Sequence, residues 1–280
     1  MPEAPEVHEL AAFLTARTSG RGIRGFDIAL GKMLKAGDPS AVIGCRVAAV
    51  TRIAKMIDVV VTDPAGTTWH VVVHFGHDGW LLWHDAVPDG MARAGDATLM
   101  ARIRLDDGAG FDLTDAGQWK SLTVHIVPHT ADIPAVAKLG PDPLDPAFDL
   151  VEFAAILAGR KKQIKALLQD QAALAGIGNA YSDEILHAAG LSPVVHASAL
   201  SQDEVGRLFG AMRTILAEST AARRGVAPED LKATKHAALR VHRRTGQPCP
   251  VCGDVIRELT FSGAAAQYCP TCQTEGVALD

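Results

Sequence analysis

Apolar residues follow two different periods along this chain, and each change of period marks a new part. Near the start, the apolar positions between Val7 and Leu14 recur at the spacing of one helical face. Pro2 and Pro5 lie in the first turn of that segment, where a helix tolerates proline. Residues 2–17 are therefore expected to form a helix.

A β-type pattern follows from about residue 22 to residue 127. Runs such as 57–61 and 69–73 are rich in valine and isoleucine, and turn residues lie between such runs. Short strands at this spacing are typical of a sandwich or a barrel. Residues 129–149, which are rich in Pro, Asp and Gly, are expected to be a linker.

The second half of the chain changes to a helical period. Ala- and Leu-rich runs extend from residue 150 to about 235, and Gly176–Asn179 interrupts two of the predicted helices. The tail is short and rich in turn residues. We therefore expect an α+β protein whose parts are residues 1–128, the linker, residues 150–240 and residues 241–280.

The charge of the chain is unevenly distributed. Its net charge of −5 argues against a generally basic, nucleic-acid-binding surface, yet residues 159–246 hold 13 Lys and Arg against 8 Asp and Glu. The start lacks the basic and apolar build of a secretory signal, and no long apolar run suggests a membrane span. A cytoplasmic protein without a membrane partner is expected.

Four of the five cysteines form two C-x2-C pairs, with sixteen residues between the pairs. Cys249, Cys252, Cys269 and Cys272 are the thiolates that one tetrahedral Zn²⁺ requires, and four protein ligands leave the metal a structural role. Two disulfides are the alternative, which a cytoplasmic location disfavours. Cys45 stands alone in a β-type run and is expected to be a buried apolar residue. The tail would then be a metal-held β-hairpin that touches nucleic acid, protein or another part of the chain.

Three separated stretches resemble one family, the formamidopyrimidine-DNA glycosylase/endonuclease VIII proteins. The start, Met1–Val7, is similar to the N-terminal signature of the family. Residues 174–186 resemble its helix-two-turn-helix DNA-binding element, and the four cysteines resemble its C-terminal zinc finger. With Lys55 and Leu139-Gly140-Pro141 the likeness covers essentially the whole chain. It implies an N-terminal helix with a β-sandwich, then a helix-two-turn-helix domain that carries a zinc-finger hairpin.

The resemblance implies catalysis by the N-terminal amine. Methionine before a small residue is normally removed, which would leave Pro2 with a secondary amine that attacks the sugar of a damaged nucleotide as in Schiff-base catalysis. Glu3 matches the acid/base position, and Glu6 matches an acidic position that would orient Pro2. Without the resemblance, Pro2 would be an ordinary helix-start proline and Glu6 a solvated first-turn glutamate.

The resemblance also implies a set of DNA contacts. Lys55 and His74 match phosphate-binding positions, and Asn179 begins a helix whose N-terminus suits a phosphate oxygen. Otherwise these would be a surface lysine, a strand histidine and a helix cap. Lys165, which follows the basic cluster at residues 160–162, is also predicted to face DNA.

The chain departs from the family at the residues that hold the lesion. The finger arginine of the family is replaced by Ala264, and Arg257 is expected on the other strand of the hairpin. By loop position, His77, Gln118 and Trp119 replace the residues that fill the gap left by a flipped base. A core tryptophan and an exposed loop histidine are the alternatives there.

In formamidopyrimidine-DNA glycosylases proper, a longer loop closes over an oxidised purine. The stretch between Leu231 and Arg240 is shorter than that loop, and in this respect the chain resembles the endonuclease VIII branch more closely. Lesion preference therefore cannot be predicted from the sequence. The leading hypothesis is a monomeric repair enzyme that removes damaged bases from double-stranded DNA and cleaves the abasic site by β- or β,δ-elimination. A member that binds damaged DNA without catalysis, and a zinc-ribbon protein that binds other proteins, are the alternatives.

Overall fold

The structure is a computed structural model that describes residues 1–88, 97–261 and 264–279, and it divides into two compact units. The N-terminal unit comprises Met1–Lys138 and Arg223–Lys232. The C-terminal unit comprises Leu139–Ala222 and Ala233–Asp280. The chain thus contributes a short segment from its second half to the N-terminal unit.

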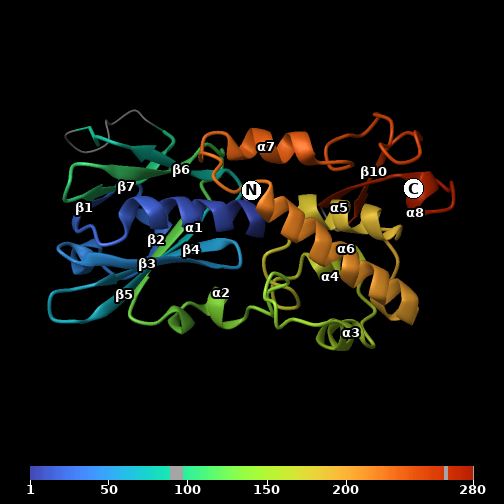
Figure 1. Ribbon diagram of the computed structural model, residues 1–280, viewed down its shortest axis with the longest axis horizontal. Coiled ribbons are helices and arrows are strands. Elements are labelled where there is room, and N and C mark those ends of the chain that lie inside the picture. Colours follow the sequence, from blue (N-terminus) through green and yellow to red (C-terminus); the bar gives the residue numbers. More distant parts are fainter. Residues whose placement is uncertain (89–96, 262–263, 280) are drawn as a thin grey trace. The chain divides into compact units, whose positions relative to one another are not determined.

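Two β-sheets form the body of the N-terminal unit (Figure 1). The first sheet is antiparallel and has the order β1-β7-β8-β6, with β1 Ile23–Ile28, β7 Leu99–Leu105, β8 Gly110–Asp115 and β6 Gly79–His84. The second has the order β2-β9-β5-β4-β3, with β2 Leu34–Ala36, β9 Thr123–Val127, β5 Thr68–His74, β4 Met56–Thr62 and β3 Arg46–Ile53. Only the short β2 runs parallel to its neighbour in this sheet. The short turns η1 Gly31–Met33 and η2 Pro39–Val42 connect the first three strands, and η3 Thr130–Asp132 and α2 Pro134–Ala137 follow β9.

One apolar core joins both sheets to the first helix, α1 (Ala4–Thr18). Val7, Leu10 and Leu14 of α1 are almost fully buried, and in this core α1 packs against β3 and β4 (Figure 1). Burial of each such aliphatic side chain contributes roughly 1.5–3 kcal/mol. Strand β5 shows the two-residue period: Val71 and Val73 enter this core, so His74 points to the opposite face of the sheet.

Residues 223–232 pack as part of the N-terminal unit. Leu231 is fully buried in its core. The Trp80 indole Nε1 donates a hydrogen bond to the Pro228 carbonyl at 3.0 Å, and Lys232 Nζ lies 4.4 Å from the centre of the Trp80 ring. The short stretch noted in the sequence forms helix α7 (Leu231–Ala238), which begins in this segment and continues into the C-terminal unit.

The C-terminal unit is a helical bundle followed by a hairpin. Its helices are α3 Leu150–Leu157, α4 Ile164–Leu168, α5 Asn179–Ala189, η4 Ala197–Ala199 and α6 Gln202–Ala221. The hairpin consists of β10 Arg257–Phe261 and β11 Ala264–Tyr268, and α8 Pro270–Gln273 follows it. Apolar faces of α3, α4, α5 and α6 share one core. Arg213 of α6 holds the incoming chain by donating to the Pro143 carbonyl at 2.8 Å.

The α+β class, the N-terminal helix with its two sheets, the helical domain and the terminal hairpin are therefore confirmed. The helix expected over residues 2–17 begins at Ala4, because Pro2 and Glu3 precede its first turn. The four-part division of the chain stays a prediction. Within the described ranges, none of the helices combines the length and the apolar character needed to cross a membrane.

Candidate functional site

The start of α1 carries three adjoining buried residues, Pro2, Glu3 and Glu6. Glu3 is the N-cap, and its backbone N–H donates to Glu6 Oε2 at 3.0 Å. The exposed fractions of Glu3 and Glu6 are 3% and 1%. A solvated first-turn glutamate is thus excluded as the description of Glu6. The carboxylate instead fixes the backbone that carries Pro2.

The returning segment 223–232 supplies the counter-charge for this helix start. Arg223 Nε lies 2.8 Å from Glu6 Oε1, and both side chains are 1% exposed. One turn further along α1, Glu9 Oε1 accepts a hydrogen bond from the Gly225 N–H at 2.8 Å. Sequence reasoning missed Arg223, because nothing in the local pattern of Arg223-Arg224 indicates a partner so far away along the chain.

Lys55 and His74 lie at one end of the β4–β5 pair. Ala54 and Lys55 form the tight turn between β3 and β4, with Ala54 at φ 51° and its carbonyl bound by Arg52 Nη1 at 3.0 Å. Lys55 is 7% exposed. In the sheet register, Met56, the residue after Lys55, is paired with His74 at the end of β5. The two predicted phosphate-binding residues thus occupy neighbouring strand ends.

The protonation of His74 follows from its contacts. Burial lowers the pKa of His74, and the charges of Lys55, His77 and His125 lower it further. The Gly76 N–H donates to His74 Nδ1 at 3.1 Å. A neutral ring that accepts at Nδ1 carries its hydrogen on Nε2, so His74 offers a single N–H donor there.

Two loops carry the residues predicted to fill the gap beneath a flipped base. The His77 N–H donates to Ser121 Oγ at 2.9 Å, which joins the β5–β6 loop to the β8–β9 loop. Buried Asp115 orders the second loop by accepting from the N–H groups of Gly117 at 2.9 Å, Ser121 at 2.7 Å and Leu122 at 3.0 Å. Trp119 is 83% exposed, so it is not a core residue.

His77 and Gln118 are exposed, which agrees both with a role in DNA binding and with an ordinary loop surface. The roles of all three side chains stay predictions.

The turn before α5 is built by two glutamines. Gln171 Oε1 accepts from the Gly176 N–H at 2.9 Å, and its amide donates to the Ile177 carbonyl at 2.8 Å. Gly176 has φ 97°, a conformation that favours glycine. At the first position of α5, Asn179 Oδ1 accepts from Gln169 Nε2 at 3.0 Å, which directs the donor end of the Asn179 amide away from that bond.

The structure corrects the prediction for Lys165. Its side chain is completely buried, and its ammonium donates to Asp183 Oδ1 at 2.5 Å and to Ser182 Oγ at 3.0 Å. A lysine held in this way does not reach a phosphate. It closely follows the exposed basic run at residues 160–162, but it lies on the inner face of α4, where it supports the start of α5.

Glu184 of α5 is a further residue that the sequence reasoning missed. Its carboxylate accepts the backbone N–H groups of Arg240, Val241 and His242 at 2.8, 3.0 and 2.9 Å. The neighbouring Asp183 Oδ2 lies 2.7 Å from His242 Nδ1. These bonds fasten the segment that leads into the hairpin to the helix that begins with Asn179.

The four cysteines of the tail meet in one place, with all four sulfur atoms within 4.8 Å of one another. The Cys249–Cys272 and Cys252–Cys269 sulfur distances are 3.9 and 3.3 Å. A tetrahedral zinc with Zn–S bonds of about 2.3 Å requires sulfur separations of about 3.8 Å, so the four residues fit the metal.

Asp254 joins the two cysteine loops, since its Oδ2 accepts from the Thr271 hydroxyl at 2.8 Å. Cys45, by contrast, lies in the N-terminal core as predicted.

The hairpin places Arg257 and Ala264 on opposite strands, as expected from the sequence. Arg257 is paired with Tyr268, whereas Ala264 begins β11 opposite Phe261. The side chain of Ala264 lies outside what the structure describes. The replacement of the family arginine by Ala264 therefore stays a prediction.

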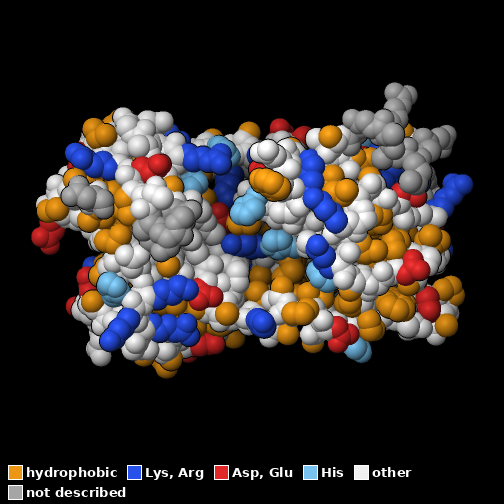
Figure 2. Space-filling model, turned by 180° about the vertical axis from the view of Figure 1, so that it is seen from behind, with side chains coloured by type: hydrophobic (Ala, Val, Ile, Leu, Met, Phe, Trp, Pro, Cys, Tyr) orange, Lys and Arg blue, Asp and Glu red, His pale blue; other side chains and the backbone are white. Residues whose placement is uncertain are grey.

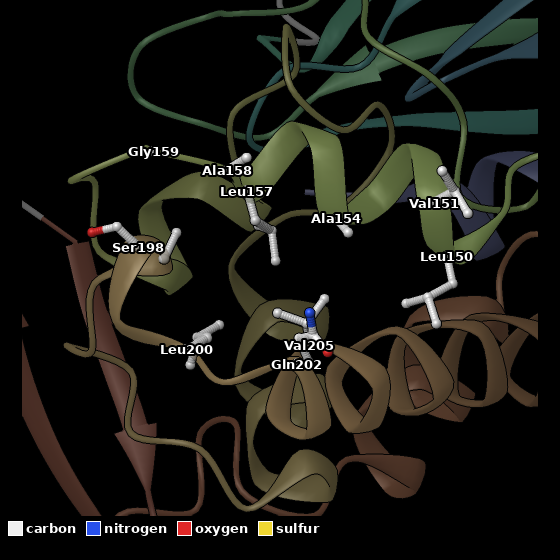
Figure 3. A pocket seen from close by; sticks show the side chains of 11 residues that line it. Leu150, Val151, Ala154, Leu157, Ala158, Gly159, Ser198, Leu200, Gln202 and Val205 are labelled. Carbon is white, nitrogen blue, oxygen red and sulfur yellow. The ribbon is translucent and has the colours of Figure 1, made fainter.

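A cavity in the C-terminal unit is lined by none of these residues. It has a volume of about 500 Å³ and is lined by apolar side chains of α3, η4 and the start of α6, including Val151, Leu157 and Val205 (Figure 3). It holds none of the predicted catalytic groups. Figure 2 shows basic and acidic side chains on the same face of the molecule, so the net charge of −5 does not make that face uniformly acidic.

Comparisons with known proteins agree with the motifs. Residues 1–120 match the formamidopyrimidine-DNA glycosylase N-terminal domain, and residues 139–228 match the formamidopyrimidine-DNA glycosylase H2TH domain. Residues 246–274 match the zinc finger found in FPG and IleRS. The matched regions coincide with the α1 and β-sheet region, the helices around Asn179 and the cysteine cluster.

Relatives extend the similarity over the whole chain. The formamidopyrimidine-DNA glycosylase of Moorella thermoacetica is 33% identical over 268 residues, which cover 92% of this chain and 94% of the relative. An uncharacterized formamidopyrimidine-DNA glycosylase-like protein of Mycobacterium tuberculosis is 48% identical over 149 residues, 53% of this chain and 93% of the relative.

Among solved structures, the Lactococcus lactis Fpg in complex with DNA containing an abasic site has a TM-score of 0.85 at 23% identity, and the match covers 97% of this chain and 99% of that one. This likeness shows the fold. The full-length similarity to the Moorella protein leads to one conclusion: the chain belongs to the formamidopyrimidine-DNA glycosylase family.

Proposed function

We propose that this protein is a base-excision repair enzyme, a DNA glycosylase with abasic-site lyase activity, and that Pro2 is its nucleophile. The observation that carries the proposal is the buried charge array at the start of α1, in which Arg223 pairs with Glu6 and Glu6 binds the Glu3 backbone. Burying two charges has a large desolvation cost, and here the buried pair fixes the backbone beside Pro2. Family membership supports the same reaction.

The reaction begins once Met1 is removed. An α-amine has a pKa near ~8, so a substantial fraction of Pro2 is neutral at cellular pH and can attack the sugar C1′. A C1′–N(Pro2) bond forms, the bond from C1′ to the damaged base breaks, and the base leaves with a proton. The amine gives up its own proton, and the sugar ring opens as O4′ takes one up. Glu3, buried beside Pro2, is the group we assign to these proton transfers.

The resulting iminium acidifies C2′. Removal of a C2′ proton lets the C3′–O bond break, so the 3′ phosphate leaves, and water then releases Pro2 from the sugar. A second elimination would occur before that release: loss of the C4′ proton into the conjugated iminium would break the C5′–O bond, and the 5′ phosphate would leave. We assign Lys55 and the His74 Nε2–H to phosphate oxygens, because both donors lie at neighbouring strand ends and His74 is kept neutral. Asn179 is assigned likewise at the start of α5, where the helix dipole favours an anion.

The other roles are proposed from loop position and chemistry. Exposed Trp119, with Gln118 and His77 in adjoining loops, is suited to fill the gap left by a flipped nucleotide. Cys249, Cys252, Cys269 and Cys272 would hold one zinc ion, which stabilises the finger. We further propose that the substrate is double-stranded DNA and that the protein acts as a cytoplasmic monomer, which size-exclusion chromatography and cell fractionation would test.

Cleavage of an end-labelled duplex with one abasic site tests the proposed function. The wild-type protein should cut at that site, while Pro2→Gly and Glu3→Gln should each lose most of the activity and still bind the duplex. A binding protein without catalysis would leave the duplex intact at every enzyme concentration, and that result would overturn the proposal. A panel of defined lesions then identifies the base removed.

The assignment of Lys55 has its own test. A charge-assisted bond to phosphate contributes roughly 1.5–3 kcal/mol, so Lys55→Ala should weaken binding of the abasic duplex about ten- to a hundredfold. The slope of log affinity against log salt should fall by about one unit. Exposed Lys35→Ala is the matched control and should change neither. Unchanged binding by Lys55→Ala would remove this residue from the phosphate site.

A further inference from the structure

A buried histidine of α5 reaches the cysteine cluster. His187, in the last turn of α5, places Nε2 3.3 Å from Cys249 Sγ, which is within hydrogen-bonding distance for sulfur. His187 is 4% exposed and Cys249 is 3% exposed. Neither the C-x2-C motif nor the helix-two-turn-helix pattern indicates this contact, because the two residues are 62 positions apart.

The direction of the bond follows from the chemistry of the cluster. A zinc-bound thiolate has no hydrogen to donate, so the hydrogen between the two atoms belongs to His187 Nε2. Among the residues that the structure describes, His187 Nδ1 has no hydrogen-bond partner. The contact with Cys249 is therefore the polar interaction that orients this ring.

Such a bond has a clear physical use at this position. Four thiolates carry more negative charge than one Zn²⁺ neutralises, and Cys249 is one of the two that are buried. Hydrogen bonds donated to the sulfur atoms spread that charge and raise metal affinity. The Val251 N–H already lies 3.5 Å from Cys249 Sγ within the cysteine loop, and His187 adds a second donor from a separate helix.

We infer that His187 is a zinc-positioning residue, whose Nε2–H donates to the Cys249 thiolate and joins the DNA-binding helix α5 directly to the metal site. The bonds from Glu184 to residues 240–242 hold the same helix against the chain that enters the finger. Helix α5 thus carries Asn179 at its first position and, in its last turn, the histidine that contacts the zinc site. This inference concerns metal binding and stands independently of the proposed enzymatic activity.

Two amide variants of the full-length protein separate the hydrogen bond from mere packing. The Gln amide nitrogen reaches about as far as histidine Nε2, whereas the Asn amide ends near the level of Nδ1. We expect His187→Asn and His187→Phe to lower zinc affinity about ten- to a hundredfold in a chelator competition, as loss of such supporting contacts typically does. The zinc affinity of His187→Gln should stay closer to that of the wild type. The control variant, exposed His196→Phe, should have the zinc affinity of the wild type.

The Co²⁺-substituted protein provides a readout that a packing defect would not move. Removing a hydrogen bond from a thiolate raises the energy of its sulfur electrons, so the sulfur-to-cobalt charge-transfer band should move to longer wavelength in His187→Asn and His187→Phe. His187→Gln should restore it, while the tetrahedral cobalt bands stay in place. Equal zinc affinity and an unmoved band in His187→Asn would overturn the inference. Equal losses in the Asn and Gln variants would also overturn it.

Discussion

The beginnings of α1 and α5 show two ways of supporting a functional group at a helix N-terminus. Each lies beside a fully buried ion pair, Glu6–Arg223 in the N-terminal unit and Lys165–Asp183 in the C-terminal unit. The two members of the second pair are 18 residues apart, within one helix-turn-helix. The first pair joins α1 to a segment from the far end of the chain, as does the Glu9–Gly225 bond over 216 residues.

The difference shows what each arrangement depends on. The start of α5 is organised by its own neighbourhood, with Gln169, Gln171 and Lys165 all within one motif. These three residues therefore support the helix start without a contact to a distant segment. The start of α1, by contrast, depends on contacts with Arg223 and Gly225, which lie far along the chain.

The largest loss of stability is expected when the Glu6–Arg223 pair is broken. Arg223→Met leaves the Glu6 carboxylate buried without its counter-charge, which should lower the free energy of unfolding by roughly 3–5 kcal/mol. Urea unfolding measures the change, and exposed Arg224→Met is the matched control. The double variant Glu6→Gln/Arg223→Met should recover part of the loss, because neither charge of this pair is then buried without the other. A loss below about 1 kcal/mol would mean that the pair contributes little to α1.

A smaller loss of stability is expected when the Lys165–Asp183 pair is broken. Lys165→Met also leaves a buried carboxylate, but Asp183 retains its hydrogen bond to His242 Nδ1. We expect a loss of about 1–3 kcal/mol, the range for a buried group that keeps some of its partners. Exposed Lys161→Met should be neutral. If Lys165→Met proved more damaging than Arg223→Met, the order of the two pairs proposed here would be wrong.

For the region around α5, much of the arrangement could be predicted from the sequence. The glycines of residues 176–178, Asn179 and the spacing of the four cysteines are local signals, and the structure places each in the expected element. The helix at the start and the valine-rich strands were likewise read from their periods.

The remaining features depend on contacts between distant segments. The pairing of Arg223 with Glu6 and the contact of His187 with Cys249 have no local signature. Lys165 was misplaced for a related reason, since charge alone does not tell which face of a short helix is buried. His74 could be named from the family pattern, but its neutral form follows only from its burial and its bond to Gly76.

The smallest effect concerns pH and the N-terminal unit. Because burial lowers the pKa of His74 below its unfolded value of about 6.5, the unfolded chain binds more protons in the interval between the two values. The stability due to neutral His74 is complete above about pH 6.5 and is lost as the pH falls toward the folded value. His74→Gln should therefore lose less unfolding free energy between pH 7.5 and pH 5 than the wild type. Identical pH profiles would contradict the buried, neutral state of His74.

The central claim is that Pro2 becomes covalently bound to the sugar of DNA. Sodium borohydride added during reaction with an abasic duplex should reduce the iminium and leave a stable adduct, and mass spectrometry should locate it on Pro2 of a chain that lacks Met1. Pro2→Gly should trap far less, and a protein with an N-terminal extension should trap none. An undiminished adduct in the extended protein, or an adduct mapped to a lysine, would contradict the account.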